Sequence, residues 1–140
     1  IDGYQLLEAR AAGADAVLLI VAALEQSVLR DLLQQTHELG MDALIETHTQ
    51  AEMEIAIGVG AKILGINNRS LETFQIDLAT TEQLAPLAPR GTILVAESGL
   101  HTGDDLRRMI AAGVNAVLVG THFMKSPDPG AALRQFLQGK

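Results

Sequence analysis

Five glycines divide the sequence into repeated units, and each stands immediately before a short apolar run. Glycine readily adopts the left-handed conformation that ends a helix, so each unit predicts a helix, a glycine and then a strand. The glycines are 20 to 31 residues apart, which suits one strand and one helix. They are Gly13, Gly40, Gly60, Gly91 and Gly113, and the runs that follow are 14–21, 41–46, 61–67, 92–97 and 114–120.

The segments between these runs carry signals for the beginning of a helix. Thr49 and Glu52 are spaced as a capping box, in which each side chain accepts a hydrogen bond from the other residue's backbone N–H. Thr102 precedes another helical pattern, and Asp128 precedes Pro129, which suits the first helical position. Strands alternating with helices predict a parallel sheet with right-handed crossovers, in one α/β domain.

The strands favour a (β/α)8 barrel over an open doubly wound sheet. Glu46, Asn67 and Glu97 each close a strand, and every second residue before them is mostly apolar. A barrel has this pattern, with a packed interior and polar chemistry at its carboxyl mouth. An open sheet also places polar groups at its carboxyl edge, so it stays an alternative. The apolar positions on this face are Leu44, Ile63, Ile93 and Val95.

Composition excludes several classes of protein. The formal net charge of −7 argues against a nucleic-acid partner, because phosphate backbones require a basic surface. The longest apolar run, 16–24, is too short to span a bilayer and lies inside the chain, so neither a membrane helix nor a signal peptide is expected. The absence of cysteine excludes disulfides and thiolate metal sites, and suits a cytoplasmic location.

Glu46, Asn67 and Glu97 are the candidate catalytic residues, because they end consecutive strands on one face. Two carboxylates in an apolar-walled pocket can differ in pKa, so that one stays ionised while the other exchanges a proton. The Asn67 amide offers a donor and an acceptor to a substrate hydroxyl. The alternative is that these polar side chains simply meet solvent at the strand ends.

Two glycine turns follow the last two strands, where barrels often bind phosphate. They are Ser98-Gly99 and Gly120-Thr121. Arg69 follows the third strand and is placed either as a cation near the mouth or as a surface residue paired with a neighbour such as Glu72.

Three histidines, His48, His101 and His122, also follow strand ends, whereas His37 lies on a predicted helix surface. A metal site is conceivable there, but no compact ligand spacing is present. We therefore expect solvated loop histidines and no metal.

Several strings resemble the indole-3-glycerol-phosphate synthase family from one end of the chain to the other. The most specific are Asn67-Asn68-Arg69 and, about thirty residues later, Glu97-Ser98-Gly99. Other matching strings lie within 4–10, 14–20 and 80–86. In place of the family's usual Glu-Val-His, this chain has Glu46-Thr47-His48, with Thr47 expected to point toward the helices.

The resemblance implies decarboxylation and ring closure of 1-(2-carboxyphenylamino)-1-deoxyribulose 5-phosphate to indole-3-glycerol phosphate, in tryptophan biosynthesis. It implies that Glu46 acts in acid–base steps and that Asn67 orients the substrate. Glu97 and Ser98 would stabilise the ring-closing intermediate. No metal or organic cofactor is implied. The residues that would line the mouth and hold the phosphate are Arg69, Gly99, Gly120 and Thr121.

The resemblance also implies that residues 1–140 are the C-terminal part of a single barrel domain, strands four to eight. A complete barrel has roughly 250 residues, and the family's general-acid lysine would precede Ile1. We expect this piece to be inactive alone, with two open sheet edges and with the inward row of Leu44, Ile63, Ile93 and Val95 facing water. Its expected partners are a phosphorylated substrate and either the N-terminal part with strands one to three or a second copy. The alternatives are another phosphate-binding barrel, such as a phosphoribosylanthranilate isomerase-like enzyme, and a non-catalytic phosphate-binding half-barrel.

Overall fold

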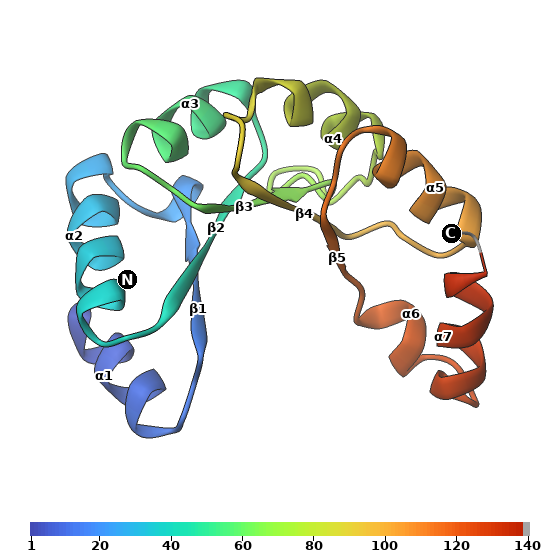
Figure 1. Ribbon diagram of the computed structural model, residues 1–140, viewed down its shortest axis with the longest axis horizontal. Coiled ribbons are helices and arrows are strands. Elements are labelled where there is room, and N and C mark those ends of the chain that lie inside the picture. Colours follow the sequence, from blue (N-terminus) through green and yellow to red (C-terminus); the bar gives the residue numbers. More distant parts are fainter. Residues whose placement is uncertain (139–140) are drawn as a thin grey trace.

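The computed structural model describes residues 1–138, which form one curved sheet of five parallel strands. The strands lie side by side in chain order, each hydrogen-bonded to the next. Figure 1 shows the sheet as an arch with an open inner side. The strands are β1 (Ala16–Ile20), β2 (Asp42–Thr47), β3 (Ile63–Asn67), β4 (Ile93–Glu97) and β5 (Ala116–Leu118).

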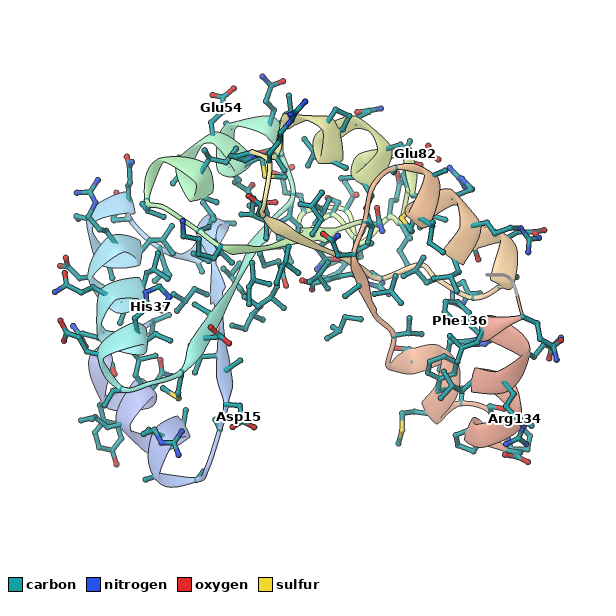
Figure 2. All side chains as sticks on the ribbon, in the orientation of Figure 1. Asp15, His37, Glu54, Glu82, Arg134 and Phe136 are labelled. Carbon is teal, nitrogen blue, oxygen red and sulfur yellow. The ribbon has the colours of Figure 1, made fainter. Side chains whose placement is uncertain are left out.

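The helices lie along the outer side of the arch (Figure 1). Two clusters of buried apolar residues join them to the sheet, one under the first four strands and one under β4, β5 and the C-terminal helices. Phe136, which Figure 2 labels on α7, belongs to the second cluster. The helices are α1 (Gly3–Ala11), α2 (Gln26–Glu38), α3 (Gln50–Gly58), α4 (Ala79–Leu84), α5 (Gly103–Ala111), α6 (Thr121–Met124) and α7 (Pro129–Leu137), with 3-10 turns η1 (Val21–Ala23) and η2 (Ala85–Leu87).

Helices on one face only distinguish an incomplete barrel from the open doubly wound sheet, which is covered on both faces. Outward side chains such as Ile45, Leu64 and Ala96 are fully buried beneath the helices. On the inner face, Leu18 and Leu118 are about half exposed, at 49% and 55%. β1 and β5 each pair with a single neighbour, so the expected open edges are present in the described part of the chain.

The apolar row on the inner face of the sheet is less exposed than the strand pattern predicts. It consists of Leu44, Ile63, Ile93 and Val95. Ile93 is open to solvent, but Leu44 and Ile63 are only partly exposed and Val95 is buried at 9%. The prediction that all four face water is therefore wrong for Val95. Val95 has a strand on each side, paired with Gly65 on β3 and Ala116 on β5, whereas the exposed Ile93 pairs only with Ile63 on β3.

All five unit-ending glycines have the positive φ that the sequence predicts, between 70° and 90°. The caps at Thr102 and Asp128 are present, with hydrogen bonds from Asp105 N and Ala131 N. The box at Thr49 is only half correct. Thr49 accepts the Glu52 backbone N–H, but the Glu52 carboxylate accepts the backbone N–H of His48 instead of Thr49. The last strand is also shorter than expected, because the chain leaves the sheet before Gly120 and begins α6.

Within residues 1–138, the structure contains no helix with both the length and the apolar character needed to cross a bilayer.

Candidate active site

Glu46, Asn67 and Glu97 meet at the carboxyl ends of β2, β3 and β4. The Asn67 amide donates to Glu46 Oε1 at 3.2 Å and accepts the backbone N–H of Arg69 at 3.0 Å. Asn67 is also paired directly with Glu97 in the sheet register. The three side chains therefore form one cluster, and their polar atoms are engaged with each other more than with solvent.

Glu97 is buried, and its side chain lies against the Glu46 carboxylate. Burial raises the pKa of Glu97 to about 7, aided by the negative charge of Glu46 and by a hydrogen bond between the two side chains. Such a hydrogen bond requires a proton on one of the two carboxyl groups. The pair therefore holds a proton near neutral pH, which suits an acid–base role.

Gly65 provides the space that Glu97 occupies. A Cβ atom built on Gly65 would collide with Glu97 Oε1 and would lie 3.3 Å from Leu44 Cδ1. Glu97 Oε1 is buried and has no hydrogen-bond partner among the described residues. The absence of a side chain at Gly65 thus determines where this carboxyl oxygen lies.

We expect Gly65→Ala to push the Glu97 carboxyl group away from Glu46. Because the displaced atom is the end of a flexible side chain, the fold should persist. A carboxyl group that leaves this site loses the burial that contributes most to its raised pKa, as well as the nearby charge of Glu46, so the pKa of Glu97 should fall by about one unit or more toward 4.5. Carboxyl ¹³C NMR titration measures this shift. Gly58→Ala, where the added Cβ would meet only one atom at 3.9 Å, is the matched control. An unchanged titration of Glu97 in Gly65→Ala would contradict this account.

A pocket of about 250 Å³ brings together the residues that the sequence assigns to phosphate binding. Arg69, Ser98, Gly99, Gly120 and Thr121 all line it. None of the described residues that line it is acidic, although the whole chain carries a net charge of −7. The pocket thus combines a guanidinium and hydroxyl groups with no opposing carboxylate, which is the composition that an anion requires.

The backbone at Ser98 and Gly99 explains how this pocket joins the carboxylates. Both residues have positive φ, 64° and 79°, which is uncommon for serine. This pair turns the chain sharply at the end of β4, directly after Glu97.

Arg69 takes part in none of the ion pairs found within residues 1–138, so the predicted alternative of a surface pair with Glu72 is not what the structure shows.

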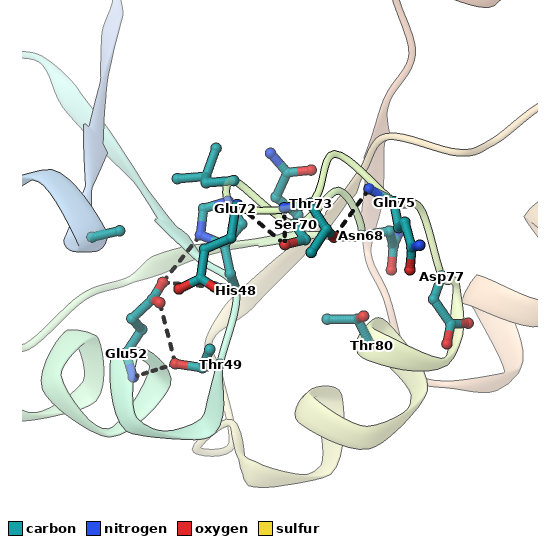
Figure 3. Close-up of a pocket in the computed structure, with 13 residues that line it drawn as sticks. His48, Thr49, Glu52, Asn68, Ser70, Glu72, Thr73, Gln75, Asp77 and Thr80 are labelled. Carbon is teal, nitrogen blue, oxygen red and sulfur yellow. Dashed lines mark hydrogen bonds and ion pairs between the residues drawn. The ribbon is translucent and has the colours of Figure 1, made fainter.

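His48 differs most from the sequence prediction, because it is buried and not a solvated loop residue. Only 8% of its side chain is exposed, and both ring nitrogens lie beside carboxylates. His48 and Glu52 line a pocket of about 360 Å³ between the loops that follow β2 and β3 (Figure 3). His101 is exposed, as expected, and His122 is partly buried, and both line the 250 Å³ pocket. His37 is exposed on α2, as expected.

Asn68 has no role predicted from the sequence, yet its side chain links two strand ends to a helix at the mouth of the incomplete barrel. Its amide nitrogen donates to the carbonyl oxygens of Glu97 and Ser98, at 3.0 and 3.1 Å. Its amide oxygen accepts from the backbone and the hydroxyl of Thr81. Asn68 therefore ties the ends of β3 and β4 to α4. Thr47 is buried on the helix side of the sheet, as expected, and donates to the Gly65 carbonyl oxygen at 2.9 Å.

Comparison with known proteins gives one consistent family. A family model described as indole-3-glycerol phosphate synthase matches residues 1–136. Curated relatives with that name include one from Dehalococcoides mccartyi, 50% identical over 97% of this chain and 52% of its own length. Another, from Campylobacter concisus, is 44% identical over all of this chain and 54% of its own length. The chain spans about half the length of these relatives.

Solved structures of lower identity show the same fold. The 3-hexulose-6-phosphate synthase of Salmonella typhimurium has a TM-score of 0.81 at 15% identity, covering 98% of this chain and 66% of that one. A structure titled "Native KDPGal structure" has a TM-score of 0.72 at 17% identity, covering 99% of this chain and 64% of that one.

Proposed function

This chain belongs to the indole-3-glycerol phosphate synthase family, and we propose that it supplies the C-terminal part of that enzyme's active site. The reaction closes the indole ring of 1-(2-carboxyphenylamino)-1-deoxyribulose 5-phosphate and releases carbon dioxide and water, so the enzyme is a carboxy-lyase. The observation that carries the proposal is the proton-sharing pair Glu46 and Glu97, which adjoins a pocket lined without carboxylates.

The residues of the cluster take complementary roles in this proposal. Glu46 exchanges protons with the substrate, and Asn67 orients the substrate hydroxyl while it holds Glu46 through its amide. Glu97 and Ser98 stabilise the intermediate that forms as the ring closes. The proximity of Glu97 to Glu46 supports the proton exchange assigned to Glu46, because a pair that shares one proton has both an acid and a base available.

The 250 Å³ pocket that Arg69 lines receives the phosphate of the substrate in this proposal. Arg69 provides positive charge, Thr121 and Ser98 provide hydroxyl groups, and Gly99 and Gly120 complete the lining. Because Ser98 and Gly99 directly follow Glu97, phosphate bound there places the rest of the substrate toward the carboxylates. No metal or organic cofactor is required by these assignments.

We further propose that residues 1–140 are one part of a single barrel domain and that the remaining part carries the strands before β1. The open edges of β1 and β5 and the exposed inner side chains Leu18 and Leu118 support this, since a closed barrel pairs both edges and covers the inner face. On this basis the chain alone is inactive. The cysteine-free composition supports a cytoplasmic location.

Activity is tested by joining this chain to the portion of the Dehalococcoides mccartyi relative that has no counterpart in it. We expect indole fluorescence to appear when the joined protein is mixed with 1-(2-carboxyphenylamino)-1-deoxyribulose 5-phosphate. The chain alone should give none. The joined protein with Glu46→Gln should lose about a hundredfold or more in rate, because the base is removed.

Two other results would point elsewhere. Phosphate binding by a folded joined protein that yields no indole would favour the non-catalytic phosphate-binding half-barrel. Turnover of phosphoribosylanthranilate in place of the decarboxylation substrate would favour the isomerase-like alternative. Full activity of the chain alone would contradict its assignment as part of the site.

A further inference from the structure

The buried side chain of Asn68 uses every hydrogen-bonding position that it has. Only 2% of the residue is exposed. Its amide offers two N–H donors and an oxygen with two lone pairs. The nitrogen donates to the carbonyl oxygens of Glu97 and Ser98, and the oxygen accepts the backbone N–H and the hydroxyl of Thr81, at 3.2 and 2.8 Å. The four positions of the amide are therefore all occupied.

The chemistry of these partners fixes the direction in which the Asn68 amide faces. A carbonyl oxygen only accepts a hydrogen bond, and a backbone N–H only donates one. The amide nitrogen must therefore face the turn that follows β4, and the amide oxygen must face α4. An amide turned over would lose its bonds to both carbonyl groups and to the Thr81 N–H.

The two carbonyl groups that Asn68 binds lie on either side of the Ser98 Cα atom. One belongs to the peptide group between Glu97 and Ser98, and the other to the peptide group between Ser98 and Gly99. Each peptide group is planar, so the rotation of one relative to the other is described by φ and ψ of Ser98. Because one amide binds both groups, it holds that rotation, with φ of Ser98 at 64°.

The left-handed backbone at Ser98 has to be held by its surroundings. A residue with a Cβ atom seldom adopts positive φ, and keeps it only where the surrounding structure enforces it. Gly99, which follows, is held by packing, since a Cβ atom built on it would collide with the Ile76 side chain. Hydrogen bonds from Asn68 and close packing at Gly99 thus act on consecutive residues of the same turn.

The direction of the chain after Ser98 shapes the 250 Å³ pocket, because residues 98–101 all line it. The strand end just before Ser98 is fixed independently, since the backbone N–H of Asn68 donates to the Glu97 carbonyl oxygen at 2.9 Å. A rotation at Ser98 would therefore move the pocket lining while Glu97 stays in the sheet. The Asn68 side chain controls that rotation, although Asn68 is not among the described residues that line the pocket.

We propose that Asn68 is a positioning residue that holds Ser98 in the left-handed conformation and so places residues 98–101 around the phosphate of the substrate. The inference rests on the proposed function for the identity of the anion. Asn68 acts through the Ser98 backbone and does not touch the phosphate.

The test is Asn68→Leu in the 140-residue chain, because leucine has nearly the branched shape of asparagine and no hydrogen-bonding atom. The one-bond Cα–Hα coupling of Ser98, measured by NMR, reports its φ. We expect positive φ in the unmodified chain and negative φ in the variant. Isothermal titration calorimetry with inorganic phosphate should show affinity lower by at least about tenfold, the equivalent of one hydrogen bond to a charged group.

Two further variants separate positioning from loss of stability. Thr81→Val removes a buried hydroxyl that donates to Asn68 but leaves both bonds to the turn. It should lower the free energy of unfolding while Ser98 stays left-handed and phosphate affinity is retained. If Asn68→Leu does not fold, Asn68→Asp keeps an acceptor for Thr81 and loses the donors to the turn, and the Ser98 coupling in that variant decides the question.

A left-handed Ser98 in the Asn68 variants would overturn the proposal. Unchanged phosphate affinity in Asn68→Leu would also overturn it, as would an equal loss of affinity in Thr81→Val. Absence of phosphate binding by the unmodified chain would count against the proposed function. The Ser98 coupling, which needs no ligand, would then still decide whether Asn68 holds the turn.

Discussion

Glu97→Gln is expected to change the free energy of unfolding differently at low and high pH. The difference between the variant and the unmodified chain should be about 3 kcal/mol more favourable to the variant above pH 7 than near pH 4. The pKa of Glu97 is about 7 in the folded chain, against the reference value of 4.5 that applies to the unfolded chain. Each unit of difference in pKa is worth about 1.4 kcal/mol of stability. Because the folded pKa is the higher one, the stability that Glu97 contributes is fully present below pH 4.5. It is lost as the pH rises from 4.5 through 7, and is constant above.

Glutamine has the shape of the protonated carboxyl group and donates to Glu46 at every pH, so the variant does not suffer this loss. The measurement is the free energy of unfolding by urea at pH 4 to 9 for both chains. Glu54→Gln removes one carboxylate from the outer rim, where Figure 2 shows Glu54, and should follow the unmodified chain. Parallel pH profiles for Glu97→Gln and the unmodified chain would contradict the burial of an ionising Glu97 beside Glu46.

Gly120→Asp is expected to weaken the binding of inorganic phosphate by at least about a hundredfold. A carboxylate about 4 Å from a phosphate is repelled by roughly 4 kcal/mol per pair of unit charges near a protein surface, which exceeds the 2.7 kcal/mol of a hundredfold change. A Cβ on Gly120 would meet no atom within 4 Å, and its φ is −108°, so the side chain fits without displacing the backbone. Isothermal titration calorimetry measures the change.

Gly120→Asn is the matched control, since asparagine has nearly the size of aspartate and no charge. It should retain most of the affinity, whereas Gly130→Asp, in the first turn of α7 and outside the pocket lining, should leave it unchanged. Equal loss in the Asp and Asn variants would show that the effect is steric. No loss in either would show that phosphate does not lie against Gly120.

Local patterns were enough to predict the strand and helix units. The glycines end helices because left-handed backbone is a property of one residue, and the caps at Thr102 and Asp128 depend on residues three positions away. The capping box predicted at Thr49 forms only in part, because two backbone N–H groups lie within reach of the Glu52 carboxylate. The carboxylate accepts the N–H of His48 and not that of Thr49. Sequence spacing does not distinguish two donors that are one residue apart.

The candidate cluster could be predicted because parallel strands bring their carboxyl ends to one edge. The pairing of Asn67 with Glu97 and the contact of Asn67 with Glu46 follow from that geometry. The burial of His48 could not be predicted in the same way. Its ring shares a pocket with the loop between β3 and α4, about twenty residues away in the chain, and only the folded sheet brings the two together.

By itself, the sequence determined the order of the elements, the polar ends of three strands, the two glycine turns and the resemblance to one family, because each is carried by neighbouring residues or by a fixed period of two along a strand. The tertiary structure alone decided the proton shared by Glu46 and Glu97, the space left for it by Gly65, and the enclosure of His48 between carboxylates. A pKa and a buried contact depend on distances between side chains from separate strands, and those distances exist only once the sheet is curved and packed.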